Sequence, residues 1–399
     1  MNVLYLLGSV PNHKHTFINR EIQELKNSGI NVIILVINPF YETGIEAKFK
    51  YLFKASYNPF ALVLNPFINL FYHKKSILFS NKGAAWKTGF ENSKISFFRL
   101  VLAGIFLESG FARLLKSKIE INHIHSHHLF SASLFTPGIA HFLNTKYSLT
   151  IHTLSKYFNS DFLTKTVQQA SFLRTVTSET YSYFKSNFSN PNINYIANGV
   201  DVLAFETSEV IKPNTLTILA VGYFLDKKGF DILIKSCRLI KDQGVKFSCT
   251  IIGEGPEKKL FTKLILDHQL ENEISILPFL DFEKLIPYFK RSHVLAVPSR
   301  DPKRSTRDGL PTVILEALAL KLPVVASDFA GISDAIIHEK TGLLIESDSE
   351  TELAQSILRI YNDHHLVNNL TENGLDLVER NFSLSKNIAK LASLFKTAS

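Results

Sequence analysis

The sequence predicts an α/β protein with two Rossmann-like domains, each built around a parallel sheet. Short strands that are apolar along their whole length, such as NVIILVI from Asn31, alternate with helical segments, which is the pattern of a parallel sheet covered on both faces. The alternation occurs twice, and a turn at Asn198 and Gly199 separates the two series. Ligands of such sheets bind beyond the carboxyl ends of the strands, so residues at those ends are the first candidates for a site.

The first series lies in the first half of the chain. Its expected strands begin at Val3, Asn31, Ile121, Tyr147, Phe172 and Ile193, and its expected helices cover Thr16–Ser28, Phe130–Leu143 and the residues before Phe188. The tract from Asn38 to Glu120 interrupts this pattern. It has helical character over Ile95–Lys116, and we expect it to hold insertions.

The second series gives the second domain. Its expected strands begin at Leu216, Phe247, Ile274, His293, Val324 and Gly342, and its expected helices cover Phe230–Lys241, Glu257–His268, the segment after Pro311 and the tail Thr351–Ala398. We therefore divide the chain into residues 1–198 and residues 199–382. The last helix, about residues 383–399, is expected to pack back on the first domain.

The composition is that of a globular protein in a reducing compartment. Of the 399 residues, 45% are hydrophobic and 20% are charged, which excludes a disordered chain. Both cysteines, Cys237 and Cys249, lie in apolar segments and are expected to be core residues. The apolar stretch Pro59–Phe71 is broken by Asn and Pro, and Met1–Leu7 lacks a basic leader. We expect a cytoplasmic protein.

The formal charge of +8 is concentrated in one tract. Residues 47–107 contain nine Lys or Arg against a single acid, Glu91, and are rich in aromatic side chains. This pattern suits either an anionic membrane surface or a plain solvated basic face. No recognition helix or zinc spacing accompanies it, so nucleic acid is not an expected partner.

The stretch Arg307–Val325 holds the strongest single site candidate. Pro311 fits the first turn of a helix, so the amides near Gly309, Leu310 and Thr312 would form an anion site at a helix N-terminus. Glu316 lies among apolar residues of that helix, and a buried carboxylate needs donors, which the hydroxyls of a ligand would supply. The alternative is an amphipathic helix with one half-exposed Glu.

Several segments occur in the order and spacing of a known family. VGYFLDKKGFDILI, IIGEGPEKK, HVLAVPSR and DGLPTVILEALALKLPVV resemble the V-G-R-L-x-x-x-K-G, I-x-G-x-G-P, pre-loop strand and E-G-x-P segments of the family-four glycosyltransferases. TIH, TSE and NGVD of the first half match more loosely. The resemblance implies the GT-B architecture, in which two Rossmann-like domains face across a cleft, and it omits only the tract 38–120.

The resemblance also implies a role for each matching residue. Glu316 would bind the ribose of a sugar nucleotide, Asp308 the hydroxyls of the donor sugar, and Lys228 the diphosphate. The amides of Gly309 and Leu310 would also meet the diphosphate. The catalytic set would be His152, Lys228 and Asp308, with His152 facing the reacting sugar. Donor binding would further involve Gly8, Tyr223, Gly253, Glu254, Pro311 and Thr312.

Three positions depart from the family pattern. Tyr223 stands where the family has an Arg that partners the Lys, so one positive charge must come from elsewhere; candidates in the loop before Asp308 are Arg300, Lys303, Arg304 and Arg307. Asp308 is one methylene shorter than the usual Glu. Ser155 stands where an acid often follows the His.

A metal or cofactor is not expected. HIHSHH, residues 123–128, invites comparison with a zinc site, but no acid or Cys lies nearby at ligand spacing. The sequence also has no Asp-x-Asp motif. The resemblance therefore implies a metal-independent enzyme whose leaving group is stabilised by a Lys and helix amides.

The sequence as a whole indicates a glycosyltransferase, and the family resemblance implies that it retains the anomeric configuration. It would move a sugar from a nucleotide-diphosphate donor to a glycan or lipid-linked acceptor, in polysaccharide, lipopolysaccharide or glycolipid biosynthesis, with peripheral membrane contact. Two alternatives stay open: a non-catalytic relative that binds a nucleotide or glycan as a scaffold, favoured by Tyr223 and Ser155, and a sugar-nucleotide epimerase that needs no acceptor.

Overall fold

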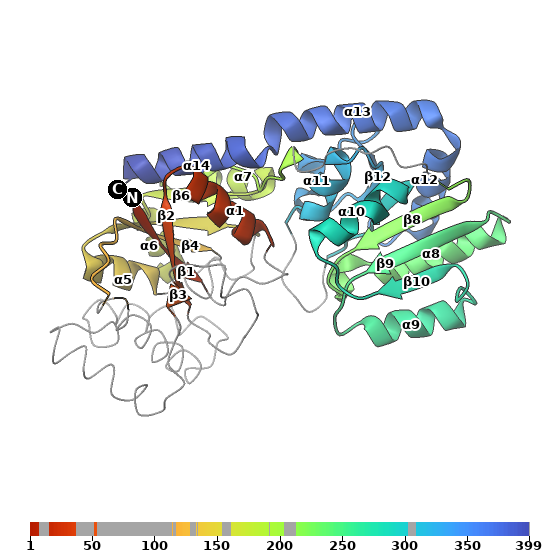
Figure 1. The fold of residues 1–399 in the computed structure, drawn as a ribbon, viewed down its shortest axis with the longest axis horizontal. Coiled ribbons are helices and arrows are strands. Elements are labelled where there is room, and N and C mark those ends of the chain that lie inside the picture. Colours follow the sequence, from red (N-terminus) through yellow and green to blue (C-terminus); the bar gives the residue numbers. More distant parts are fainter. Residues whose placement is uncertain are drawn as a thin grey trace. The chain divides into compact units, whose positions relative to one another are not determined.

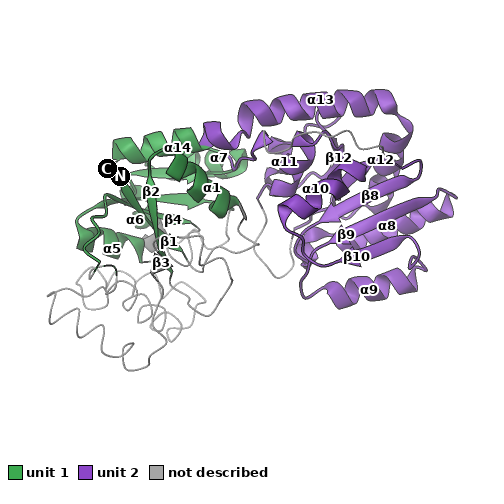
Figure 2. Ribbon diagram, viewed as in Figure 1, with its two compact units in different colours: residues 1–196, 388–399 green, residues 197–387 purple. Residues whose placement is uncertain are grey.

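The fold consists of two compact units, each with its own parallel sheet. The computed structural model describes residues 1–7, 16–36, 52–53, 114, 117–127, 133, 135–153, 161–190, 192–202, 213–301 and 309–398. Within these ranges the strands form one sheet of seven strands and one of six (Figure 1). One unit comprises Met1–Ile196 with Ile388–Ser399, and the other Ala197–Asn387 (Figure 2). The predicted α/β class with two parallel-sheet units is confirmed.

The seven-stranded sheet has the order β3-β2-β1-β4-β5-β6-β7, and its described pairs are all parallel. Its elements are β1 (Asn2–Leu7), α1 (Thr16–Asn27), β2 (Asn31–Val36), β3 (Leu52–Phe53), β4 (His123–His127), α5 (Thr136–Leu143), β5 (Lys146–Ile151), α6 (Asp161–Gln169), β6 (Phe172–Thr175), α7 (Ser178–Asn187) and β7 (Ile193–Tyr195).

The two faces of this sheet differ in polarity because side chains alternate along each strand. Leu4 and Leu6 of β1 and Ile124 of β4 enter an apolar cluster with α5 and α7. The opposite face of β4 carries His123, His125 and His127, all fully or almost fully buried. Polar side chains on one buried face of a central strand indicate a specific network there.

The six-stranded sheet has the order β10-β9-β8-β11-β12-β13. Its elements are β8 (Leu216–Val221), the 3-10 turn η4 (Asp226–Lys228), α8 (Phe230–Asp242), β9 (Phe247–Ile252), α9 (Lys258–Asp267), β10 (Ile274–Leu277), α10 (Phe282–Arg291), β11 (Val294–Val297), α11 (Thr312–Ala319), β12 (Val324–Ser327), the 3-10 turn η5 (Ala330–Asp334), β13 (Leu343–Ile345), α12 (Glu350–Asn362), α13 (His364–Asn381) and α14 (Leu384–Ala398).

Both faces of the six-stranded sheet are apolar, as its continuous hydrophobic strands predicted. Ile218 of β8 and Val294 of β11 enter one cluster with α8, α9 and α12, whereas Leu219 and Leu295 enter another with α10 and α11. Cys237 and Cys249 are buried free thiols, as expected for core residues.

The C-terminal helix α14 contributes one aromatic side chain to the first unit. Phe395 is fully buried, and its ring centroid lies 5.1 Å from that of His125, 5.4 Å from that of His123 and 5.5 Å from that of Phe172. The division between the units falls within this helix, after Asn387. The end of the chain therefore closes the polar face of the seven-stranded sheet.

Several sequence-based expectations lie outside the described residues. They concern the basic tract 47–107, nearly all of the helix over Ile95–Lys116, and Gly8, Ser155, Lys303, Arg304, Arg307 and Asp308. Helix α5 begins at Thr136, whereas the sequence placed its start at Phe130. None of the helices described is both long and apolar enough to cross a membrane.

Replacing Phe395 with Ala should destabilise the protein. The change removes a fully buried ring from contacts with the rings of Tyr5, His123, His125 and Phe172, and truncation of such a Phe costs about 3–5 kcal/mol. Chemical denaturation would measure the loss. Lys396→Ala, at the exposed neighbouring position of the same helix, is the control and should change stability by less than about 0.5 kcal/mol. Equal stability of both variants would show that α14 does not anchor this core.

Candidate functional site

Lys228 lies in a turn at the carboxyl end of β8 that is fixed by close backbone packing. It ends the 3-10 turn η4, and Gly229 follows in the left-handed region with φ of +64°. A Cβ at Gly229 would lie 1.9 Å from the carbonyl oxygen of Pro298, which follows β11. The stem of Lys228 runs beside Gly222, because a Cβ on Gly222 would meet its Cε at 3.6 Å. Only glycine permits this approach between neighbouring strand ends.

The turn after β9 is tied to the turn after β8 in the same way. The amide of Phe224 donates to the carbonyl of Glu254 at 2.7 Å, and the amide of Gly253 donates to Leu277 at 3.0 Å. A Cβ at Gly253 would lie 1.9 Å from the carbonyl oxygen of Gly222. The carboxyl ends of β8, β9 and β10 therefore form one continuous edge. It includes Tyr223, Lys228, Gly253 and Glu254 from the predicted donor site.

Arg300 fastens this edge through three carboxylates. Its guanidinium pairs with Asp226 at 2.5 Å, Asp231 at 3.0 Å and Asp348 at 3.0 Å, and its backbone amide donates to Lys227 at 3.1 Å. Burial acts to lower the pKa of Arg300, but Asp231 and the hydrogen bonds to Asp348 and Asp226 raise it above its ordinary value. Three carboxylates surround the guanidinium, so Arg300 is a poor source of the positive charge that Tyr223 does not supply.

Helix α11 places a buried carboxylate near the ends of β11 and β12. Glu316 is only 6% exposed and lies in a helix whose other residues from Val313 to Ala319 are buried and apolar. Pro311 precedes the helix with φ of −64° and provides no side-chain cap. Gly309, Leu310, Pro311 and Thr312 are half-buried. The expected geometry of a helix N-terminus with a buried acid beyond it is present.

His152 lies in the other unit, immediately after β5, and is 7% exposed. Its Nε2 is 3.0 Å from Nδ1 of His127, and Nε2 of His127 is 3.1 Å from Oε1 of Glu21. Glu21 also pairs with Arg174 and accepts a 2.6 Å hydrogen bond from the hydroxyl of Tyr5. A buried polar chain thus runs from His152 at the strand end to an ion pair inside the unit.

The positive charges near Glu21 keep its carboxyl group ionised in this row of buried polar side chains. Burial acts to raise the pKa of the Glu21 carboxyl, but Arg174 and then His127 lower it well below its ordinary value. Burial, with the Glu21 charge next, raises the pKa of the Tyr5 hydroxyl, which therefore stays a donor. Folding with an ionised Glu21 contributes stability above the unfolded carboxyl pKa of about 4.3 that is lost as the pH falls toward the folded value.

The histidine strand does have an acid beside it, contrary to the expectation from spacing. Ligand atoms of Glu21, His125 and His127 lie within 4.8 Å of one another, a grouping that could hold a cation. Helix α1 brings Glu21 there from more than a hundred residues away, which local spacing cannot reveal. However, Arg174 occupies the same carboxylate, and both ring nitrogens of His125 bond to hydroxyls, at 2.7 and 2.8 Å. A metal would have to displace these partners.

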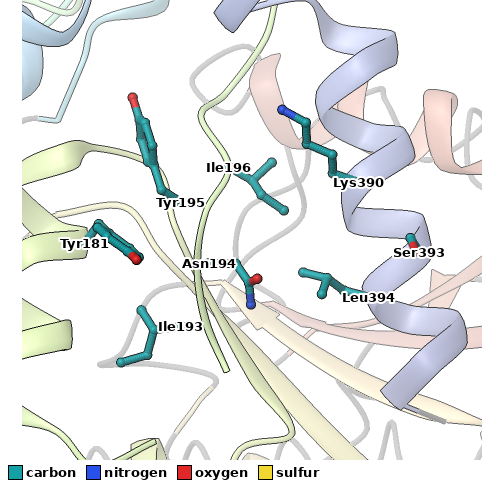
Figure 3. Close-up of a pocket in the computed structure, with 8 residues that line it drawn as sticks. All are labelled: Tyr181, Ile193, Asn194, Tyr195, Ile196, Lys390, Ser393 and Leu394. Atoms are coloured by element: carbon teal, nitrogen blue, oxygen red, sulfur yellow. The ribbon is translucent and has the colours of Figure 1, made fainter. Parts of the chain in front are cut away.

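A pocket of about 580 Å³ lies in the first unit but contains no predicted site residue. Figure 3 shows its lining residues on α7, on and beside β7, and on α14: Tyr181, Ile193, Asn194, Tyr195, Ile196, Lys390, Ser393 and Leu394. Parallel α/β sheets bind ligands beyond the carboxyl ends of their strands, and none of the residues singled out at those ends lines this pocket. We therefore do not assign the chemistry to it.

Part of the chain is similar in sequence to known glycosyltransferases. A model of the family described as glycosyl transferases group 1 matches residues 204–376. The chain is 33% identical to the amylovoran biosynthesis glycosyltransferase AmsK of Erwinia amylovora, over 36% of each chain. It is 31% identical to the putative colanic acid biosynthesis glycosyltransferase WcaL of Escherichia coli, over 40% of this chain and 39% of that one. The matches thus span less than two thirds of these relatives.

Solved structures share the fold at low sequence identity. The Anabaena protein HepE, solved in complex with UDP and glucose, is 15% identical with a TM-score of 0.73, and the match covers 100% of both chains. A glycosyltransferase from Rickettsia africae is 18% identical with a TM-score of 0.69 over 100% of this chain and 98% of that one. These likenesses establish the fold that the sequence resemblance predicted.

Gly229→Ala should cost much more stability than Gly244→Ala. Both glycines have left-handed φ values, +64° and +74°, but a Cβ at Gly244 meets nothing within 4 Å. The shared backbone cost is about 1–2 kcal/mol, and Gly229→Ala adds the collision with Pro298. Thermal unfolding of both variants would isolate that contact. Equal losses would mean that the two strand ends do not require this approach.

Proposed function

Because a model of the glycosyl transferases group 1 family matches residues 204–376, we propose that the chain transfers a sugar from a nucleotide-diphosphate donor to a glycan or lipid-linked acceptor. The observation that carries the proposal is the edge of the six-stranded sheet. Lys228 lies at the end of β8, α11 begins after the adjacent strand β11, and Glu316 is buried in that helix.

Each of these features suits one part of a sugar nucleotide. Lys228 supplies a mobile positive charge for the diphosphate, and the amides at the start of α11 supply further donors. Glu316 accepts hydrogen bonds from the ribose hydroxyls. HepE, of the same fold, was solved with UDP-glucose.

The proposed chemistry proceeds with retention of the anomeric configuration. The bond between the sugar and the diphosphate breaks through an oxocarbenium-like state, and the acceptor hydroxyl attacks from the same face. Lys228 and the α11 amides stabilise the negative charge on the departing diphosphate. His152 and Asp308 contact the donor sugar. Tyr223 contributes no charge, so the leaving group depends on Lys228 more strongly than it would beside an Arg.

Surface polysaccharide biosynthesis is the proposed setting. AmsK and WcaL, both similar over about two fifths of this chain, are named for amylovoran and colanic acid biosynthesis. A lipid-linked acceptor agrees with the nine basic residues and many aromatic residues of the tract 47–107. We propose that this tract contacts an anionic membrane surface.

A panel of sugar nucleotides tests the donor assignment. Lys228→Ala should lower kcat by about 100-fold or more, because it removes a charge that acts on the leaving group. Glu316→Gln should weaken donor binding by roughly 10-fold or more. Lys246→Ala, an exposed lysine before the amino end of β9, is the matched control and should leave both values unchanged.

Three outcomes of that panel would contradict the assignment. Unchanged turnover in the Lys228 and Glu316 variants would show that these residues do not form the donor site. Binding without turnover, with acceptors supplied, would favour a scaffold, for which Tyr223 is the supporting observation. Isomerisation of the donor without an acceptor would favour an epimerase.

Removal of metal ions should leave turnover unchanged. The proposed site uses Lys228 and backbone amides where a metal-dependent transferase places a divalent cation. Initial rates would be measured after dialysis against EDTA and again after addition of Mg²⁺ or Mn²⁺. Loss of activity in EDTA with recovery on adding one of these ions would overturn metal independence.

A further inference from the structure

We propose that Glu21 and His127 are positioning residues that hold His152 in one tautomer, with its Nδ1 as the hydrogen-bond acceptor. The proposal rests on the proposed function in one respect, that His152 contacts the donor sugar. Its geometric basis is the chain Glu21–His127–His152, with successive distances of 3.1 and 3.0 Å. All three side chains are at most 7% exposed.

The charge on Glu21 decides which nitrogen of His127 carries a proton. Its carboxylate receives donors from Arg174 and Tyr5 and lies 3.1 Å from Nε2 of His127. Arg174 is itself fixed, because its Nε donates to the carbonyl of Ile196 at 2.9 Å. The contact lacks hydrogen-bond geometry at Nε2, so it is electrostatic. An ionised carboxylate presents only lone pairs and would repel a bare nitrogen at this distance, so Nε2 of His127 carries a proton.

The charge balance favours a neutral His127. Among the described residues Glu21 and Arg174 pair with one another, and a proton on both nitrogens of His127 would add a second buried positive charge beside Arg174. A neutral imidazole has one donor and one acceptor nitrogen. With Nε2 of His127 as the donor toward Glu21, Nδ1 is the acceptor.

The same rule then fixes His152. Its Nε2 faces the acceptor Nδ1 of His127 at 3.0 Å, so Nε2 of His152 carries the proton. In the neutral ring, Nδ1 is left with the lone pair. That nitrogen can accept a hydrogen bond from a sugar hydroxyl, whereas the opposite tautomer would present a donor. The rings of His127 and His152 stack at 5.3 Å with 19° between their planes, and Phe17 lies 4.7 Å from His152, so packing restrains the ring as well.

Removing the charge of Glu21 should exchange the donor and acceptor nitrogens of both His127 and His152. In Glu21→Gln the amide oxygen is retained by Arg174, which can only donate, and the amide NH₂ turns toward His127. His127 must then accept at Nε2 and donate at Nδ1, so His152 presents N–H at Nδ1. His152 then presents a donor where the sugar hydroxyl donates, and loss of that hydrogen bond in the transition state lowers the rate by roughly 10–100-fold.

The matched controls separate this effect from simple loss of packing. Glu24→Gln makes the same chemical change one turn later on α1, where Glu24 is half-buried and bonds to Asn27 at 3.0 Å. Tyr5→Phe removes one donor to Glu21 but leaves its charge and Arg174. Both should keep the wild-type tautomers.

The test combines ¹⁵N NMR of histidine-labelled full-length protein with kinetics. Wild type should show protonated Nε2 and unprotonated Nδ1 for His152, and Glu21→Gln should show the reverse with kcat lowered by roughly 10–100-fold. The dissociation constant for UDP should stay unchanged in Glu21→Gln, because the nucleotide site belongs to the other unit. Glu24→Gln and Tyr5→Phe should resemble wild type.

Several results would overturn the proposal. One is Nδ1–H at His152 in the wild-type protein, which requires no variant to fold. Another is equal kcat for Glu21→Gln and Glu24→Gln in a protein that turns over its donor. A stoichiometric metal ion in the purified protein would show that Glu21 and His127 bind a metal instead of setting the tautomer of His152. If the wild-type protein turns over no donor, the proposed function fails, while the tautomer assignment is still decided by NMR.

Discussion

The close approach of backbone to backbone at the carboxyl edge of the six-stranded sheet is the constraint on which the proposed donor site depends. Gly229 touches the residue after β11, and Gly253 touches the turn after β8. A side chain at either position would separate the strand ends, and the turn that holds Lys228 would move with them. Arg300 strengthens the same edge through three carboxylates that neutralise it. Among the residues described at this edge, Lys228 carries a flexible positive charge of the kind that suits a diphosphate.

The seven-stranded sheet differs from the six-stranded sheet because one of its faces buries charged groups and three histidines. Glu21 and Arg174 form the centre of that network, and Phe395 of α14 closes it. Burying such groups is costly unless each is paired. An apolar face of similar volume would be simpler, so we attribute the retained polarity to the strand end that it supports, where His152 lies.

The sequence predicted the strands well because they are continuous apolar runs bounded by glycine turns, and most boundaries agree within one or two residues. It also predicted Lys228 and Glu316 as site residues from local signals, and their roles stay proposals. Glu21 was missed as a partner of the histidines because no local pattern links α1 to β4. In retrospect, an acid at helical spacing among Ile18, Ile22 and Leu25 was an available signal. The three acids around Arg300 come from separate turns, so only the fold brings them together.

The central claim is that Lys228 and the α11 amides bind a diphosphate. Comparing the binding of UDP and UMP tests this claim most directly. Calorimetric titration of the full chain should show tighter binding of UDP, and Lys228→Ala should remove most of that difference while leaving UMP binding unchanged. If the donor panel identifies another base, the corresponding diphosphate and monophosphate are used. Equal affinity of the diphosphate and monophosphate for the wild-type protein would contradict the account.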